Sequence, residues 1–529
     1  MRKWMVLLTL SLSMFIIVID TTVMNVSISA LVVDLNTSVT GIQAAISLYA
    51  LVMASFILIG GKLADVIGKK RTFVLGLAIF GVGTAMASIS TSLMMLIIGW
   101  SVIEGIGSAL MMPNIQTILR EAYEDKDRAT AYGVISAVGA VGAAMGPIVG
   151  GFLTTYYSWR WAFRLEVAIV IVVLVCCRYI STELRQGSRP KFDYVGAALS
   201  IFGWSTIVMA VLLGQSYGFW VAKQPFVIGS MKLAPLGLSV VPFVFLTGVT
   251  LIFVLFSWTA GRDEQGDVAI FRPSVFRTTG LKAGIAVRFI QMAVMAAFLF
   301  TMPLLLQLSF EFTAMETGLA LIPFSLALLV SALGGARLSA QFSARLIIRT
   351  GFLLAIVGLI LIAVTVSPDA EPSDMATGIV FGAGVGLIAS QILNLVLSSV
   401  APDQTAEVSG LNGTFEQLGN SIGVALVGTI MLGTLTTGLQ DRVMAYPDLE
   451  AEAKVEITQA LQNSVELVSS SQLAEAMQDA GASVDQSAVI LKAYGEERTQ
   501  SFKIGVWFLV FLSLLGLIVT RSLPNRKLV

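Results

Sequence analysis

The chain has 529 residues, of which 56% are hydrophobic and 12% are charged, and its 33 Lys and Arg balance its 33 Asp and Glu. A soluble domain carries about 25% charged residues, so most of this chain's surface cannot face water and we expect an integral membrane protein. The sequence contains no His, which excludes imidazole as a metal ligand, a general base or a pH sensor and leaves proton chemistry to carboxylates.

Apolar segments of roughly 20 residues, the length that crosses the hydrocarbon core as a helix, recur along the whole chain. They predict an all-α membrane protein with fourteen transmembrane helices. Their approximate limits are 4–33, 40–62, 72–90, 92–113, 129–153, 162–182, 193–214, 234–257, 279–307, 315–337, 347–366, 374–399, 407–437 and 500–520. The first segment runs too long for a signal peptide, so we expect it to stay in the mature protein.

The distribution of basic residues indicates how these spans are oriented. An even number of spans puts both termini on one side, and most of the Lys and Arg fall in the loops of that side, including Lys69, Lys70 and Arg71. The positive-inside rule therefore places both termini in the cytoplasm. The long polar segment 438–497 then lies outside, and its apolar residues at i, i+4 spacing predict short amphipathic helices.

Two segments of the chain repeat at nearly the same offset. Four glycines of the fifth span recur 277 residues later in the thirteenth: Gly133, Gly142, Gly146 and Gly151 answer to Gly410, Gly419, Gly423 and Gly428. The loop after the second span has a weaker copy 275 residues on. We therefore predict two six-helix bundles related by a pseudo-two-fold axis, residues 1–192 and 279–529, with 193–278 as an inserted two-helix hairpin and linker. Parallel repeats of this kind are typical of transporters.

Ionisable residues inside the predicted spans are candidates for coupling, because such groups are costly in a bilayer and usually face the bundle interior. They are Asp20, Glu104, Arg164, Glu166, Arg288 and Glu416. A proton and a cationic substrate that compete for one carboxylate suffice for antiport, so we take Asp20, Glu104 and Glu416 as proton-coupling candidates. A permanent ion pair is the alternative for each. For Arg164 and Glu166, near the outer end of the sixth span, we favour a structural ion-pair role.

Polar and flexible side chains near these positions are candidates for lining a substrate cavity: Asn25, Ser101, Ser108, Arg288, Gln291, Met292, Asn412 and Asn420. Asn412 and Asn420 flank Glu416 at i−4 and i+4, which predicts a polar stripe on one helix face. Methionines suit an adaptable surface for amphiphiles, although ordinary helix packing is the alternative. Arg288 is a possible counter-ion for Glu416, in which case the pair is structural.

Three motifs resemble those of the major facilitator superfamily. Asp20-x-Thr22-Val-Met-Asn25 in the first span is similar to the signature of fourteen-span drug:proton antiporters. Gly61-Lys-Leu-Ala-Asp65-Val-Ile-Gly68-Lys69-Lys70-Arg71 resembles the superfamily's loop between spans two and three, and Gly142-Ala-Ala-Met-Gly146-Pro147-Ile-Val-Gly150-Gly151 resembles the antiporter motif of span five. The resemblance implies the major facilitator fold and a gating role for these last two motifs; for the glycines and Pro147, helix packing alone fits equally well.

The fourth span departs from the family pattern. An Arg normally lies four residues before the Gly-x-Gly of this span and a Gln directly before it, whereas Gly105-Ile-Gly107 here follows Ser101 and Glu104. The residue usually associated with proton coupling is therefore missing, and a carboxylate occupies the place of an amide. The family's usual coupling mechanism does not transfer unchanged.

Together these features predict a secondary active transporter that exports amphipathic, in particular cationic, drugs or toxic compounds in exchange for protons, with a role in antibiotic resistance. We expect a multi-pass monomer in the plasma membrane (a prokaryotic inner membrane), whose partners are a small-molecule substrate, protons and lipid, with no cofactor, metal or nucleic acid. No GxxxxGK[ST] motif is present, which argues against ATP-driven transport by this chain alone.

Other functions compete with drug export. Arg164, Arg288 and the missing Arg of the fourth span favour an exporter of a dedicated endogenous lipid or zwitterionic metabolite. A channel or a non-transporting receptor is a more remote alternative. We do not expect an enzyme, because the sequence has no His, no metal cluster and no Ser nucleophile with a candidate base in a recognisable motif.

Overall fold

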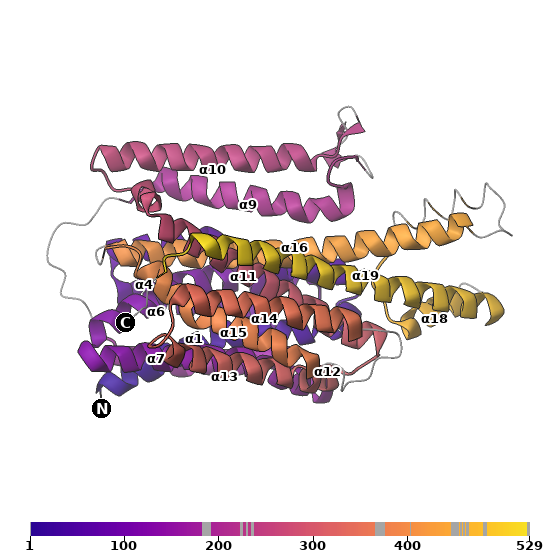
Figure 1. Ribbon diagram of the computed structural model, residues 1–529, viewed down its shortest axis with the longest axis horizontal. Helices are drawn as coiled ribbons and strands as arrows, with labels where there is room; N and C mark the ends of the chain where they lie inside the picture. The colour runs from indigo at the N-terminus through magenta and orange to yellow at the C-terminus, as the bar shows by residue number, and fades with distance from the viewer. Residues whose placement is uncertain are drawn as a thin grey trace.

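The computed structural model describes residues 2–525, except for 182–191, 223–225, 229–230, 234–236, 366–375, 402–403, 480–483 and most of 446–464. The described chain forms an elongated bundle of roughly parallel helices with both termini at the same end (Figure 1). We call this end the terminal end and the opposite one the far end.

The helices of the first half of the chain are α1 (Arg2–Val26), α2 (Ile28–Asp34), α3 (Val39–Ile67), α4 (Lys69–Ala87), α5 (Leu93–Leu96), α6 (Gly105–Ala122), α7 (Asp125–Tyr156), α8 (Arg160–Cys176), α9 (Tyr194–Tyr217) and α10 (Val241–Glu264). A π-helix, η1 (Ile97–Glu104), joins α5 to α6, and a short 3-10 turn, η2 (Cys177–Tyr179), follows α8. Between α9 and α10 lies a small antiparallel hairpin of β1 (Phe226–Ile228) and β2 (Met231–Leu233), with Phe226 opposite Leu233.

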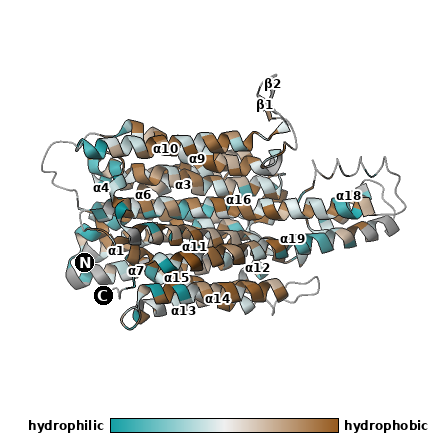
Figure 2. Cartoon of the chain, turned by 45° about the horizontal axis from the view of Figure 1, so that its top comes forward, coloured by the Kyte–Doolittle hydropathy of each residue, from teal (hydrophilic) through white to brown (hydrophobic). Residues whose placement is uncertain are grey.

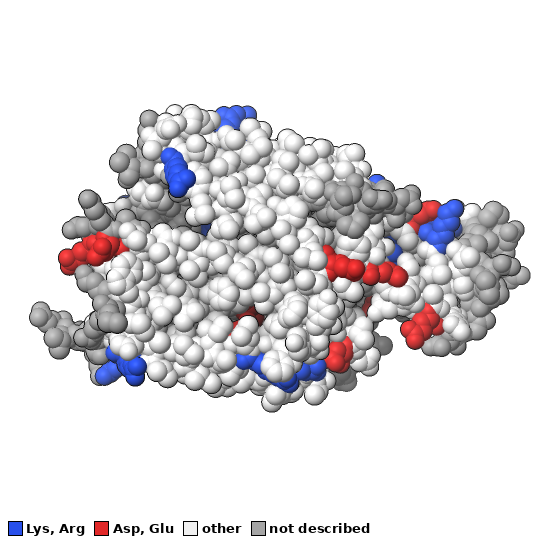
Figure 3. All heavy atoms as spheres, turned by 90° about the horizontal axis from the view of Figure 1, so that it is seen from below, with Lys and Arg blue, Asp and Glu red and all other residues white. Residues whose placement is uncertain are grey.

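The second half contains α11 (Thr279–Leu304), α12 (Ala314–Ala320), α13 (Ile322–Leu338), α14 (Ala344–Thr365), α15 (Gly378–Leu397), α16 (Thr405–Ala445), α18 (Ser470–Asp479) and α19 (Val484–Val519). A second π-helix, η5 (Leu305–Ser309), extends α11, and the 3-10 turns η4 (Pro273–Arg277) and η8 (Thr520–Ser522) lie at the terminal end. Apolar residues cover most of the helix length, whereas hydrophilic residues collect towards the ends (Figure 2). The face in Figure 3 is largely uncharged, as expected for a surface in contact with lipid.

In the described part of the chain, twelve helices are long and apolar enough to cross a membrane, or thirteen when α12 and α13 count as one span. The all-helical membrane architecture is therefore confirmed, but the number fourteen is not. The sixth predicted span is the 17-residue helix α8, shorter than those twelve. The tenth is bent by 41° between α12 and α13, where Pro323 follows the break and cannot donate a backbone hydrogen bond. The first predicted span is likewise interrupted at Ser27.

Glycines of the internal repeat make equivalent helix contacts in the two halves of the chain. A Cβ on Gly146 of α7 would collide with Thr22 of α1, and a Cβ on Gly423 of α16 would collide with the carbonyl of Ala293 on α11. The repeated sequence thus corresponds to repeated packing of α7 on α1 and of α16 on α11.

A second pair of repeat glycines joins the two halves to each other. Gly151 of α7 lies against the carbonyl of Ala314 on α12, and Gly428 of α16 lies against the side chain of Gln43 on α3. Helices α7 and α16 therefore each pack within their own half through one repeat glycine, Gly146 or Gly423. Each packs against the other half through a second one, Gly151 or Gly428.

Helices α9 and α10 pack on each other along one flank of the bundle, and α9 contacts α3 and α16 (Figure 1). Val208 of α9 is buried with Leu51 of α3 and Leu418 of α16, whereas Phe253 and Leu246 of α10 are exposed. The hairpin thus touches both halves of the chain through one helix and presents the other outward.

The polar segment 438–497 protrudes at the far end, where α16, α18 and α19 extend beyond the other helices (Figure 1). Arg442 pairs with Glu496 at 2.7 Å and with Glu497 at 2.5 Å, and the buried Arg498 donates to the carbonyl of Val468 at 2.7 Å. The expected short helix in this segment is present as α18, although most of 446–464 lies outside the described residues.

Candidate functional site

Three carboxylates that are distant in the sequence meet inside the first half of the chain. Asp20 of α1, Glu104 at the end of η1 and Glu166 of α8 each contribute an oxygen, and these oxygens all lie within 4.8 Å of one another. The residues are 1%, 0% and 2% exposed. We call Asp20, Glu104 and Glu166 the carboxylate trio.

The π-helix η1 places Glu104 in the trio. A π turn adds a residue to the helical turn and changes the direction of the side chains that follow, and such turns are frequent at functional sites. Gly83 of α4 packs so closely on η1 that a Cβ there would lie 2.5 Å from the backbone nitrogen of Glu104. Close packing of α4 thus holds the end of η1 in position.

Hydrogen bonds differ among the three members of the trio. Trp100 donates its indole N–H to both oxygens of Asp20, at 2.8 and 3.0 Å. Thr84 donates to Oε2 of Glu166 at 3.0 Å. Neither oxygen of Glu104 has a hydrogen-bond partner among the described residues, although both are buried.

Aromatic and hydroxyl groups support this arrangement from α3 and α6. The ring of Tyr49 stacks on Trp100 with centroids 5.1 Å apart, and its hydroxyl lies 2.9 Å from the hydroxyl of Ser108. Ser101 donates to the carbonyl of Ala45 at 2.8 Å, so its side chain ties η1 to α3. Ser108 therefore belongs to the surroundings of the trio, while Ser101 serves helix packing.

No ion pair in the described part of the chain neutralises the trio. Two unit charges 4.8 Å apart repel by about 3.5 kcal/mol at an effective dielectric constant of about 20. Three buried carboxylates without a basic partner therefore cannot all remain ionised, and they must take up protons or another cation.

The predicted structural ion-pair role of Arg164 and Glu166 is wrong for both residues. Arg164 is exposed and lies over the ring of Trp161, 4.9 Å from its centroid, and it has no ion pair among the described residues. Glu166 instead points to Asp20 and Glu104. Residues two apart on a helix face different sides, so their closeness in sequence does not bring the side chains together.

A second charged group lies between α11 and α16 in the other half. Arg288 binds Oε2 of Glu416 at 2.6 Å and donates to Oε1 of Gln291 at 3.1 Å. The side chains of Arg288 and Glu416 are 11% and 14% exposed. The sequence left two roles open for Glu416, proton coupling or an ion pair with Arg288. The structure contains this ion pair.

The other polar candidates differ in whether their side-chain polar atoms have hydrogen-bond partners. The buried Asn412 has no partner for Oδ1, and Gln291 has none for Nε2. Asn420 is half-buried and donates to Gln417 at 3.1 Å, and Met292 packs against Gly419. The role of this stripe along α16 in lining a cavity stays a prediction, and Met292 serves helix packing.

Asn25, near the end of α1, donates to the carbonyl of Thr21 at 2.8 Å and leaves its own Oδ1 buried without a partner. The amide nitrogen of Asn25 is therefore hydrogen-bonded within α1, while its oxygen is available to another donor.

The loop motif between α3 and α4 fastens the terminal ends of several helices. Gly68 has a φ of 99°, a backbone conformation that other residues rarely adopt, and it separates α3 from α4. Lys69 forms an ion pair with Glu121 at the end of α6, and Lys70 donates to the carbonyl of Ile180 at 2.6 Å, beyond α8. Arg71 is exposed, and Gly61 lies beside Pro113 of α6.

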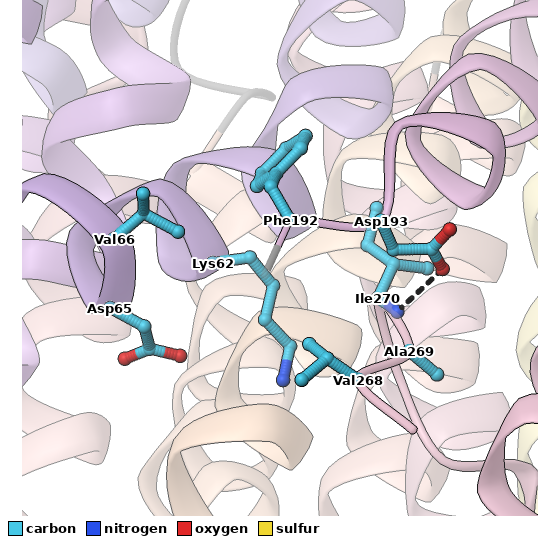
Figure 4. A pocket seen from close by; sticks show the side chains of 8 residues that line it. All are labelled: Lys62, Asp65, Val66, Phe192, Asp193, Val268, Ala269 and Ile270. Carbon is cyan, nitrogen blue, oxygen red and sulfur yellow. Dashed lines mark hydrogen bonds between the residues drawn. The ribbon is translucent and has the colours of Figure 1, made fainter. Parts of the chain in front are cut away.

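Asp65 of the same motif borders a small pocket between α3 and the α9–α10 hairpin (Figure 4). Its lining residues are Lys62, Asp65, Val66, Phe192, Asp193, Val268, Ala269 and Ile270. Asp193 accepts hydrogen bonds from Gly196, from Trp258 at 3.0 Å and from Ile270 at 3.1 Å. Asp193 thus joins both helices of the hairpin beside the loop motif.

The antiporter-like motif of α7 forms part of the boundary with α12. The carbonyl of Pro147 lies against Gly318, and the amide of Met315 donates to Thr155 at 2.9 Å. On its other side, Gly142 packs against Val18 and Gly150 against Val23, both on α1. The motif therefore connects a helix that carries part of the trio to the other half of the chain.

Hydrogen bonds at the far end also cross between the halves. Gln43 donates to the carbonyls of Val424 at 2.8 Å and Ala425 at 3.2 Å, and Ser421 donates to the carbonyl of Ser47 at 2.7 Å. Gln307 of η5 donates to the carbonyl of Val26 at 2.7 Å. These contacts hold the two halves together at the far end.

Sequence reasoning did not identify Tyr49, Thr84, Trp100 or Gln43. Trp100 could have been found because it lies one helical turn before Glu104 with an N–H that needs a partner when buried. Tyr49, Thr84 and Gln43 carry no such signal, because ordinary polar residues recur in many membrane helices.

Known proteins resemble this chain along most of its length. The family model described as Major Facilitator Superfamily matches residues 10–424. The probable actinorhodin transporter of Streptomyces coelicolor is 28% identical, over 82% of this chain and 73% of that protein. The puromycin resistance protein pur8 of Streptomyces alboniger is 27% identical (83% and 84%), and the multidrug resistance protein Stp of Mycobacterium tuberculosis is 26% identical (84% and 78%).

Solved structures of transporters share the fold. An inward-facing bacterial homolog of the human lysosomal transporter Spinster aligns with a TM-score of 0.59 and 18% identity, covering 98% of this chain and 97% of that one. A peptide transporter of the POT family aligns with a TM-score of 0.60 and 15% identity, covering 98% and 95%. At such identities the likeness concerns the fold alone.

Proposed function

The chain belongs to the major facilitator superfamily, and from this premise we propose that it exports amphipathic drugs or toxic compounds, cationic ones in particular, in exchange for protons. The family is one of membrane transporters, so the chain is a transporter and not an enzyme. Drug export is supported by the relatives, whose names refer to resistance to puromycin or to several drugs. We place the transporter in a prokaryotic plasma membrane, as a monomer with both termini in the cytoplasm.

The carboxylate trio is the observation that carries proton coupling. It is buried, it has no basic partner among the described residues, and the sequence offers no His for the task. Protons bound there reduce the negative charge of the trio, and a cationic substrate that approaches it replaces them as the source of positive charge. Asp20 and Glu104 are thus coupling residues in our proposal, whereas the Arg288 pair makes Glu416 the weaker candidate.

Alternating access follows from the way the halves meet. We propose that residues 1–192 and 279–529 rock against each other with 193–278 at the side, and that the far-end contacts of Gln43, Ser421 and Gln307 close the extracellular gate. The glycines of α7 and α16 support such motion, because helices in close backbone contact can pivot without side chains interlocking. The loop motif would hold the helix ends of the first half together during the movement.

Transport in proteoliposomes tests this proposal. A quaternary ammonium dye is the appropriate substrate, because it cannot be trapped by protonation. We expect saturable dye accumulation in vesicles with an acidic lumen, loss of accumulation when the pH gradient is collapsed, and counterflow without a gradient. Flux that does not saturate would indicate a channel, and binding without counterflow would indicate a non-transporting receptor.

A second candidate function rests on the pair of Arg288 and Glu416. Opposite charges 2.6 Å apart, with Gln291 bonded to Arg288 and Asn412 one helical turn before Glu416, present both an anion-binding and a cation-binding group to a zwitterionic molecule. This favours export of a dedicated endogenous lipid or zwitterionic metabolite. The same vesicles, loaded with a zwitterionic amphiphile instead of the dye, distinguish the two functions by which substrate accelerates counterflow.

A further inference from the structure

Glu166 extends the coupling site beyond the residues that the sequence analysis assigned to proton coupling. Resting on the proposed function, we propose that Glu104 and Glu166 each carry one proton beside an ionised Asp20, so that two protons enter for each monovalent cation exported. Glu166 then takes a direct part in proton transport, and the exporter moves one net positive charge inward in every cycle.

The hydrogen bonds of the trio indicate which of its carboxyl groups carry a proton. The indole N–H of Trp100 can only donate, and it contacts both oxygens of Asp20. Donation to both oxygens stabilises the ionised carboxylate, so Asp20 is the member best suited to stay charged.

Glu104 is in the opposite situation. Both of its oxygens are buried and accept no hydrogen bond of normal geometry from the described residues, and the nearby hydroxyl of Thr84 donates to Glu166 instead, so an ionised Glu104 would have little to replace its hydration. A proton on Glu104 removes that charge and gives the residue an O–H donor beside the carboxyl groups of Asp20 and Glu166.

Glu166 can change state without losing its partner. The hydroxyl of Thr84, 3.0 Å away, donates to an ionised carboxylate and can rotate to accept from a protonated one. Glu166 is therefore held in place in both forms, which is what a residue that binds and releases a proton requires.

The titratable groups that face the trio are few. They are Tyr49 on α3 and the three carboxyl groups themselves, on α1, η1 and α8, while α4 contributes the uncharged Thr84. Of the basic residues on α8, Arg160 pairs with Asp34 at 2.5 Å and Arg164 is exposed. Among the described residues no cation is thus available to substitute for the two protons.

Each transport cycle in this proposal carries one net positive charge into the cell. From outside, two protons bind, one on Glu104 and one on Glu166. Rocking opens the site to the cytoplasm, where water that reaches the trio hydrates the ionised carboxylates; one monovalent substrate cation then takes the place of both protons, which pass to the cytoplasm, and the cation leaves in the next half-cycle. Two positive charges enter and one departs, so a membrane potential that is negative inside drives export in addition to the pH gradient.

The experiment measures the number of protons per substrate in proteoliposomes with the quaternary ammonium dye. At equilibrium and zero membrane potential, one unit of pH difference sustains a dye gradient of about 100-fold for two protons and about tenfold for one. We expect about 100-fold for the wild type and about tenfold for Glu166→Gln, which also loses the dependence on membrane potential. Arg164→Gln, a change on the exposed side of the same helix, should behave like the wild type.

The outcomes separate this inference from the proposed function. A wild-type gradient of tenfold per pH unit overturns the two-proton site but leaves proton-coupled export in place, and this result does not depend on any variant folding. Unchanged stoichiometry in Glu166→Gln also overturns the role of Glu166. Absence of any pH-driven accumulation in the wild type overturns the proposed function itself.

Discussion

Replacing Glu416 by Gln should destabilise the protein because it leaves Arg288 charged and poorly hydrated. At 2.6 Å and an effective dielectric constant of about 20, the pair attracts by about 6 kcal/mol before desolvation is subtracted. Breaking one side of a buried pair typically costs about 3–5 kcal/mol. The side chains are 11% and 14% exposed, and Gln can still accept from the guanidinium, so we expect about 3 kcal/mol.

The assay compares thermal unfolding of Glu416→Gln, Arg288→Gln and the double variant in detergent, together with binding of a cationic and a neutral ligand. If the pair is structural, both single variants melt lower and the double variant recovers most of the loss, since neither partner is then left unpaired. A Glu416→Gln variant with an unchanged melting temperature and a selective loss of the cationic ligand would refute this reasoning. It would make Glu416 a substrate-binding residue.

Three further predictions follow from the contacts between helices. Gly423→Ala should lower the melting temperature and slow transport, because the added Cβ meets the backbone of α11, whereas Gly133→Ala, with open space around it, should not. Gln43→Leu removes two hydrogen bonds across the far end, so spin-label distances there should shift towards a wider separation, and unchanged distances would argue against a gate. In a background without the two native cysteines, Ser470→Cys should react with an impermeant reagent added outside cells and Arg71→Cys should not; the reverse labelling would invert the proposed orientation.

The sequence showed that all three members of the trio are ionisable residues within apolar segments, but it favoured Glu416 over Glu166 for coupling and could not show how the three are arranged. Asp20, Glu104 and Glu166 are conspicuous because each interrupts a long apolar segment. Their meeting depends on the π turn before Glu104 and on the way α1, α4 and α8 pack, and neither leaves a pattern that can be read along the chain. Arg164 and Glu166 were given a structural ion-pair role because both lie near the outer end of the sixth span, although residues two apart on a helix face different sides.

Contacts between distant segments of the fold also differ in how far the sequence predicts them. The glycines of α7 and α16 repeat at a fixed spacing, and their contacts with α1 and α11 repeat too, because close helix packing requires small residues at those positions. The bend between α12 and α13 was missed although Pro323 was visible, since many membrane helices accommodate a proline without a break. The sequence offered Glu416 as a possible counter-ion of Arg288, but only the distance of 2.6 Å shows that the two side chains touch.

Proton release on substrate binding tests the coupling role of the trio most directly. Purified protein in weakly buffered detergent solution is mixed with the quaternary ammonium dye while a pH indicator reports free protons. We expect the wild type to acidify the solution in proportion to the dye bound, and the triple variant Asp20→Asn, Glu104→Gln, Glu166→Gln not to do so. Dye binding without proton release in the wild type, or equal release in the triple variant, would contradict it.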